Sequence, residues 1–201
     1  RPFGLIFEDA TGKYLPIQMG AWTKATRKIM DSCGWSNGKL LAHIHEKWGY
    51  SGNVQLECII NGADGVWASV CDEGAALGHA SSSITLMNLV RFGNKKVLKN
   101  YNCSYLRTAA RNVTEITTGN EAFSRQPIYG ERALDLVFDF GGIAGGIEGD
   151  DFNLVKFFNE KPIVRINTLS SENNILTRMK DVFGDQPIFT LEIAKQMKRE
   201  M

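Results

Sequence analysis

The N-terminal half of the chain alternates between short apolar runs and longer stretches in which apolar residues recur at helical spacing. The apolar runs lie at 3–8, 39–45 and 65–71, and turn residues or charges bound them, which is typical of buried strands. The helical patterns that follow them lie at 17–33, 53–60 and 84–92. Strands and helices that alternate at this pitch predict an α/β fold with a parallel sheet and crossover helices.

Helix boundaries are marked by particular residues. Pro16 precedes the first helix, in which Ile17, Trp22, Ala25 and Ile29 follow helical spacing. Three serines from Ser81 can cap the helix at 84–92.

Beyond residue 93 the pattern becomes mainly helical. Apolar spacing predicts helices at 105–117, 152–158, 175–183 and 190–201. A short apolar run at 134–140 predicts a strand, and the glycine-rich segment 141–149 predicts a loop. We therefore expect two parts, an α/β part at 1–93 and a helical or mixed extension at 94–201.

Composition and charge exclude several classes of protein. The 201 residues are 43% hydrophobic and carry a net charge of +1, which suits a packed core and excludes a strongly basic nucleic-acid-binding surface. No run approaches about 18 apolar residues, so we expect no membrane span. The 4 cysteines form no CxxC pair, which argues against a cysteine-only zinc site and against a disulfide scaffold. We expect a reducing compartment, the cytoplasm.

All 3 histidines lie at the carboxyl ends of consecutive predicted strands. His43 and His45 are two residues apart at the end of a strand, so their side chains point to the same face, as a pair of metal ligands would. The alternative interpretation is that this HxH spacing arose by chance and that one of the two histidines is a hydrogen-bonded core residue. His79 follows the next strand, and the carboxyl ends of parallel strands share the edge where sites are built. The three histidines together favour a metal site.

Other candidate residues lie at the same predicted edge. Asp9 ends the first strand, where it could support a histidine, contact substrate, or simply order the turn before the next helix. Cys71 and Glu73 follow the third strand, and a thiol and a carboxylate near a metal could act as acid or base. The alternative is that Cys71 is a small core residue and Glu73 a solvated carboxylate.

An ordered set of motifs resembles the DRE-TIM metallolyases, which include hydroxymethylglutaryl-CoA lyase and the isopropylmalate, homocitrate and citramalate synthases. The matching residues are Asp9-x-x-Gly12-x-x-x-Pro16, His43-x-His45, Gly78-His79, the helix with Leu106, Ala109, Val113 and Ile116-Thr117, and Pro127-Ile128-Tyr129-Gly130. The resemblance covers residues 4–133. It implies that residues 1–93 are the C-terminal portion, about three strand–helix units, of a (β/α)8 TIM barrel, and that 94–201 follow the barrel.

The resemblance also implies a function. It points to a lyase or a Claisen-type synthase (an acyltransferase) that depends on Zn²⁺, Mg²⁺ or Mn²⁺ and acts on a keto or hydroxy acid or its acyl-CoA ester. His43 and His45 would be metal ligands, with His79 at the position of the family's asparagine. Asp9 and Thr11 would bind substrate, although Ala10 stands where the family usually has a threonine that contacts substrate, and Thr11 is next to it. Cys71 lies one position from the lyase's catalytic cysteine.

Several departures favour a different reading. Gly74-Ala75-Ala76 replaces the family's G-E-R, and residues 131–135 replace the synthases' histidine segment. The alternative is therefore a degenerate, non-catalytic member that serves as a binding or scaffold module. A TIM barrel needs about 250 residues, so we expect its first five strands and their D-R-E motif to lie outside these residues. Three parallel strands leave two unpaired edges, so we also expect a homo-oligomer.

Overall fold

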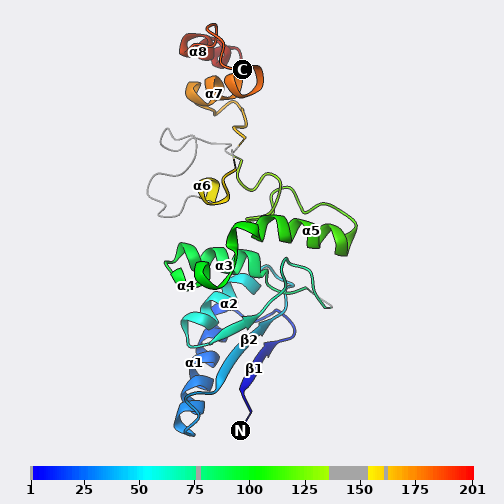
Figure 1. Cartoon of the computed structure of the whole chain (residues 1–201), viewed down its shortest axis with the longest axis vertical. Coiled ribbons are helices and arrows are strands. Elements are labelled where there is room, and N and C mark those ends of the chain that lie inside the picture. The colour runs from blue at the N-terminus through cyan, green and yellow to red at the C-terminus, as the bar shows by residue number, and fades with distance from the viewer. Residues whose placement is uncertain (1, 76–77, 136–153, 161–162) are drawn as a thin grey trace. The chain divides into compact units, whose positions relative to one another are not determined.

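The computed structural model describes residues 2–75, 78–135, 154–160 and 163–201, which belong to two compact units (Figure 1). Unit 1 comprises Arg1–Phe123 and Pro127–Gly130, and unit 2 comprises Ser124–Gln126 and Glu131–Met201. Unit 1 thus includes residues 94–123, which are assigned above to the extension. The loop predicted at 141–149 and most of the strand predicted at 134–140 lie outside the described residues.

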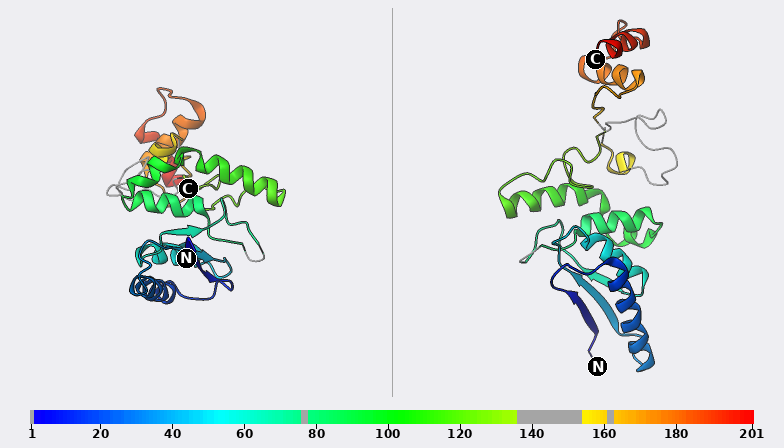
Figure 2. Two further views of the ribbon diagram at one scale, coloured as in Figure 1. Left: turned by 60° about the horizontal axis from the view of Figure 1, so that its bottom comes forward. Right: turned by 180° about the vertical axis from the view of Figure 1, so that it is seen from behind.

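A three-stranded parallel sheet lies at the centre of unit 1. Its strands β1 (Gly4–Asp9), β2 (Lys39–Ile44) and β3 (Gly65–Trp67) are paired in chain order. The crossover helices α1 (Pro16–Ser32) and α2 (Ser51–Ile60) lie on the same side of the sheet (Figure 2). This arrangement confirms the predicted alternation of strands and helices and their parallel pairing.

The core of unit 1 fills the space between the sheet and these two helices. Leu40, Ala42 and Ile44 occupy alternate positions of β2 and are at most 1% exposed. Ala42 and Ile44 pack in one cluster with Met19 of α1 and Val54 of α2. Burial of each large aliphatic side chain contributes about 1.5–3 kcal/mol, so this layer holds the sheet on its helices.

The other face of the sheet is only partly covered by the described residues of unit 1. Ile6 of β1 is 53% exposed and Trp67 of β3 is 54% exposed, although both lie in the sheet. Parallel sheets are usually covered on both faces, so this apolar face differs from that of a complete parallel α/β domain.

Helix α1 is present as predicted, but it buries a different face. Ile17 and Ile29, whose spacing indicated the helix, are 73% and 62% exposed. The buried positions are instead Met19, Thr23 and Met30. Gly20 lies on the same buried face, and a Cβ atom there would meet Cγ of Glu57 in α2 at 2.6 Å, so the absence of a side chain lets α1 and α2 pack closely.

The third strand is shorter than the predicted range 65–71. It ends at Trp67, and residues 68–71 turn away from the sheet to meet the start of the next helix. There the backbone oxygen of Ser69 accepts a hydrogen bond from Ser82 N at 2.7 Å, and Val70 O accepts one from Ser83 N at 3.3 Å. Backbone groups that could have extended the strand are therefore paired with the helix start.

The remaining helices of unit 1 follow this turn. The helix α3 (Ser82–Arg91) begins with the predicted serine cap, because Ile84 N donates to Ser81 Oγ at 3.4 Å. The short helix α4 (Lys95–Asn100), not predicted from the sequence, and the 3-10 turn η1 (Cys103–Tyr105) lead to α5 (Leu106–Thr118). Helix α5 confirms the helix predicted at 105–117.

The described part of unit 2 holds three helices joined by irregular segments. It contains α6 (Leu154–Phe158), α7 (Glu172–Phe183) and α8 (Leu191–Glu200). Ser171 and Thr190 cap the last two helices through their side-chain oxygens. A small core of Ile175, Met179 and Ala194 holds these two helices together. None of the helices in the described part of the chain is both long and apolar enough to cross a membrane.

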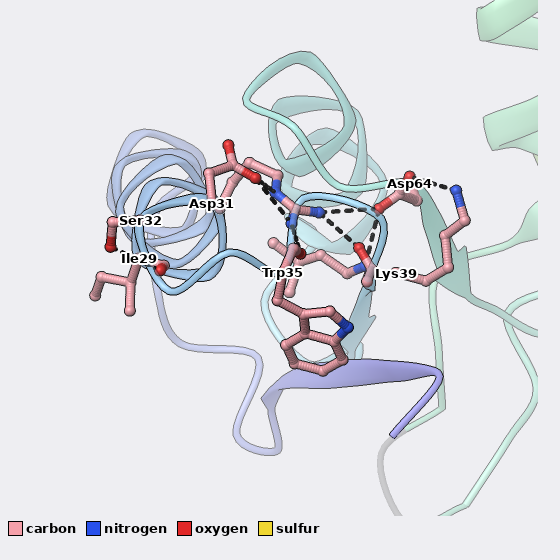
Figure 3. Close-up of polar contacts among 9 residues, drawn as sticks. Ile29, Asp31, Ser32, Trp35, Lys39 and Asp64 are labelled. Carbon is pink, nitrogen blue, oxygen red and sulfur yellow. Dashed lines mark hydrogen bonds and ion pairs between the residues drawn. The ribbon is translucent and has the colours of Figure 1, made fainter. Parts of the chain in front are cut away.

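A polar cluster closes the amino-terminal edge of the sheet (Figure 3). Arg27 of α1 donates to the backbone oxygens of Trp35 at 3.0 Å and Gly38 at 2.8 Å, and its guanidinium lies 3.4 Å from Asp64. Asp64 also accepts from Leu40 N at 2.9 Å and from Lys39 Nζ at 3.1 Å. These bonds join α1, the start of β2 and the residue before β3, which leaves the opposite edge for a site.

Candidate metal centre

Three histidines meet at the carboxyl edge of the sheet. His43 belongs to β2, His45 follows that strand directly, and His79 lies in the loop before α3. One potential ligand atom from each lies within 4.8 Å of the others. Among the described histidines, cysteines and acidic residues, these three are the group that could hold one metal ion. The predicted convergence of the three side chains is therefore present.

The imidazoles are close enough to share an ion. Nε2 of His43 and Nε2 of His79 are 2.8 Å apart, and their rings stack with centroids 4.9 Å apart. The ring of His45 lies 4.4 Å from that of His79, centroid to centroid. Two imidazole nitrogens on one tetrahedral zinc lie roughly 3.3 Å apart, so a small opening of the first pair would admit an ion.

The loop that carries His79 is fixed to β2 by its backbone. His79 forms an isolated antiparallel bridge with His45, and Glu46 N donates to Gly78 O at 3.0 Å. His79 N also donates to Asp72 O at 3.3 Å. A Cβ atom on Gly74 would overlap Nδ1 of the His79 ring, so the absence of a side chain at position 74 makes room for this imidazole.

Burial disfavours the charged form of two of these imidazoles, those of His43 and His79. Burial lowers the pKa of His43; the charge of Glu8 opposes this shift, and His45 adds to it. Burial also lowers the pKa of His79, with His45 and His43 adding to the effect. A neutral imidazole has a free lone pair, which is the form that binds a metal.

The donor set fits a divalent transition metal. His45 is 8% exposed, and its Nδ1 is buried without a hydrogen-bond partner among the described residues. A buried acceptor without a partner costs about 1–3 kcal/mol, and a metal ion bound there would satisfy it. Imidazole nitrogens suit Zn²⁺ better than Mg²⁺, which prefers oxygen ligands. Of the three metals left open above, this set favours zinc.

Glu8 is part of this centre, although its sequence context did not single it out. It lies opposite His43 in the register of β1 and β2, and its Oε1 is 3.2 Å from His45 Nε2 and 3.9 Å from His43 Nδ1. The sequence offered one sign of this role, a carboxylate near the end of an otherwise apolar strand, two positions from Ile6. Only the register of β1 and β2 shows that this carboxylate lies beside the histidines.

Asp9 and Thr11, the candidate substrate-binding residues, are joined to each other. Asp9 is 1% exposed, and its Oδ1 accepts from Thr11 N at 3.0 Å and Thr11 Oγ1 at 2.9 Å. Its Oδ2 accepts from Tyr14 N at 3.1 Å. The carboxylate therefore orders the turn between β1 and α1, which is the turn-forming role considered from the sequence.

Cys71 and Glu73, the candidate catalytic residues, lie in different environments. Cys71 is fully buried in a cluster with Ala110 and Tyr129, and it is not part of the histidine group. Glu73 is half-buried in the loop that leads to His79. Tyr129 ties this loop down, because its hydroxyl donates to Asp72 Oδ2 at 3.1 Å and accepts from Asp72 N at 3.3 Å.

Comparison with known proteins adds no assignment to this geometry: no protein-family model matches the sequence, and no curated protein matches it.

Proposed function

We propose that this chain belongs to a metal-dependent carbon–carbon lyase or Claisen-type synthase of the DRE-TIM kind. Its substrate would be a keto or hydroxy acid or the corresponding acyl-CoA ester. The observation that carries the proposal is the convergence of His43, His45 and His79 within 4.8 Å at the carboxyl edge of a parallel sheet. That edge is where parallel α/β enzymes place their reacting groups.

The architecture supports this proposal. In a TIM barrel each strand has a helix on its outer side and turns its inner face to the barrel interior. Here α1 and α2 lie on one side of the sheet, while the face with Ile6 and Trp67 is partly open. We propose that the α/β part is the last portion of such a barrel, with this open face turned inward.

The proposed division of labour follows from the positions of the side chains. A divalent ion, when bound, supplies Lewis acidity toward the oxygens of a keto or hydroxy acid. His43, His45 and His79 would hold it. Glu73, half-buried in the His79 loop, is the proposed acid or base. Cys71 contributes packing in this proposal because its thiol is fully buried.

Turnover by the full-length protein that contains these residues tests the proposal. Protein stripped of metal and then supplied with Zn²⁺, Mn²⁺ or Mg²⁺ would be assayed against a panel of keto acids, hydroxy acids and their CoA esters in both directions. We expect activity that depends on metal and falls at least 100-fold in His43→Ala. Metal-independent turnover, or equal turnover by His43→Ala, would contradict the proposal.

A non-catalytic binding module is the second candidate. One observation favours it: both carboxylate oxygens of Asp9 are used within the turn, and Ala10 beside it offers no hydroxyl to a substrate. Such a module would bind metal with the same histidines yet turn over no member of the panel. Detectable metal-dependent turnover would exclude it.

Two further proposals concern assembly and compartment. We propose self-association, because the sheet leaves apolar side chains on its open face. We propose a reducing compartment such as the cytoplasm, because the cysteines, Cys33, Cys58, Cys71 and Cys103, are all free thiols.

A further inference from the structure

A carboxylate lies beside two of the three histidines. Glu8 projects from β1 on the same face as His43 of β2, with which it is in register. Its Oε1 lies 3.2 Å from Nε2 of His45 and 3.9 Å from Nδ1 of His43. One carboxylate oxygen therefore faces one nitrogen on each of two rings.

The contact with His45 determines which nitrogen of that ring carries the proton. An ionised carboxylate can only accept a hydrogen bond, so the bond to Glu8 requires a hydrogen on Nε2 of His45. In the neutral ring the lone pair then lies on Nδ1. That atom is buried and has no hydrogen-bond partner among the described residues. The free lone pair of His45 is thus held away from Glu8 and left available.

The same reasoning extends to His43. Its Nδ1 faces Glu8 at 3.9 Å, whereas its Nε2 faces Nε2 of His79 at 2.8 Å. The negative charge of Glu8 favours the hydrogen on Nδ1, which leaves the lone pair of Nε2 directed at His79. His79 must then be the donor in the contact between the two rings.

We propose that Glu8 is a positioning residue that selects the tautomers of two metal ligands, so that His45 binds through Nδ1 and His43 through Nε2. The inference rests on the proposed metal centre and deepens it. Histidine ligands commonly donate their other ring N–H to a carboxylate, and loss of that partner typically weakens metal binding 10- to 100-fold. The carboxylate also places one negative charge beside a site for a dication.

Tautomers in the metal-free chain test the inference without any metal or substrate. In protein labelled with ¹⁵N-histidine, two-bond ¹H–¹⁵N spectra distinguish the two neutral forms of each ring. In the unsubstituted chain we expect His45 protonated on Nε2 and His43 on Nδ1. Glu8→Ala should mix the tautomers of both rings, and Glu8→Gln should retain the His45 preference in part, because its amide oxygen still accepts.

Metal affinity is the second readout, measured by competition for Zn²⁺ with a chromophoric chelator. We expect affinity to fall about 10- to 100-fold in Glu8→Ala and less in Glu8→Gln. Glu115→Gln, an exposed glutamate of α5, is the matched control and should leave affinity and tautomers unchanged. Because the Glu8 side chain is 46% exposed, its replacement should not prevent folding, which the melting curve of each variant would verify.

The outcomes separate this inference from the proposed function. Unchanged tautomers of His43 and His45 in Glu8→Ala, or unchanged zinc affinity, would overturn the role of Glu8 while the metal centre stands. An unsubstituted chain with the expected tautomers but no zinc binding would instead overturn the metal centre.

Discussion

At the scale of single residues, the site depends on small structural features around the histidines. Gly74 leaves space for the His79 ring, Tyr129 holds the loop that carries it, and Glu8 faces the other two rings. None of these residues is itself expected to bind metal. Their substitution therefore probes the geometry of the centre while its ligands stay in place.

Gly74→Ala should displace His79. The new Cβ would overlap Nδ1 of this ring, so the imidazole must turn away from His43. We expect zinc affinity, measured by chelator competition, to fall about 10-fold or more, as for other changes around metal ligands.

The matched control is Gly52→Ala in α2, where a Cβ would meet nothing within 4 Å. That change should keep zinc affinity and leave stability equal or raise it by up to about 1 kcal/mol. Equal zinc affinities in the two variants would contradict the position of His79.

Tyr129→Phe should loosen the His79 loop. Burial, together with the charge of Asp72, raises the pKa of Tyr129 well above its usual range, so its hydroxyl remains a donor to that carboxylate. Loss of this buried hydrogen bond should lower the free energy of unfolding by about 1–3 kcal/mol, measured by urea denaturation. The corresponding change at the exposed Tyr105 should cost much less, and equal losses would contradict the contact.

At the scale of elements, the sequence predicted what depends on local pattern and missed what depends on packing. The strands, the crossover helices and the Ser81 cap follow from apolar spacing and turn residues. The buried face of α1 was not predicted, because apolar spacing alone does not show which side of the helix meets the sheet and α2, and Ile17 and Ile29 are exposed. The early end of β3 was not predicted either, because the backbone hydrogen-bond partners of Ser69 and Val70 lie at the start of the next helix.

Asp64 should make the amino-terminal edge of the sheet sensitive to acid. Burial acts to raise the pKa of this carboxyl, but the hydrogen bond from Leu40 N and the charges of Lys39 and Arg27 outweigh burial and lower it. A lowered pKa in the folded chain means that the stabilisation is complete above the unfolded value of 3.8 and is lost as pH falls through the folded value.

Urea denaturation of Asp64→Asn against the unsubstituted chain tests this effect. We expect a loss of about 1 kcal/mol near neutral pH, moderate because the side chain is 31% exposed, and a shrinking difference below pH 3.8. Asp31→Asn, at the exposed end of the same cluster, should cost less. A difference for Asp64→Asn that stays constant down to pH 2 would contradict this account.

At the scale of the whole molecule, the main departure from a self-sufficient α/β fold is the face of the sheet that the described residues of unit 1 leave partly open. Ile6 and Trp67 lie exposed on a face that parallel sheets normally cover. The sequence resemblance predicts such a face, because the interior of a barrel is closed by strands other than these three. We therefore expect this face to be covered by association with another polypeptide chain.

Sedimentation velocity over a range of concentrations tests the assembly. We expect a mass that increases with concentration for the unsubstituted chain, and a shift toward monomer for Ile6→Gln, which makes the open face more polar. Leu191→Gln, an exposed leucine of α8 in unit 2, should leave the mass distribution unchanged. A monomer at all concentrations would contradict self-association.

The central claim is that His43, His45 and His79 form one metal centre, and metal content tests it most directly. The full chain would be equilibrated with Zn²⁺, dialysed, and analysed by inductively coupled plasma mass spectrometry, beside His43→Ala and His79→Ala. We predict about one zinc per chain, lost in both variants although both remain folded. Equal zinc content in the unsubstituted chain and the two variants would contradict the account.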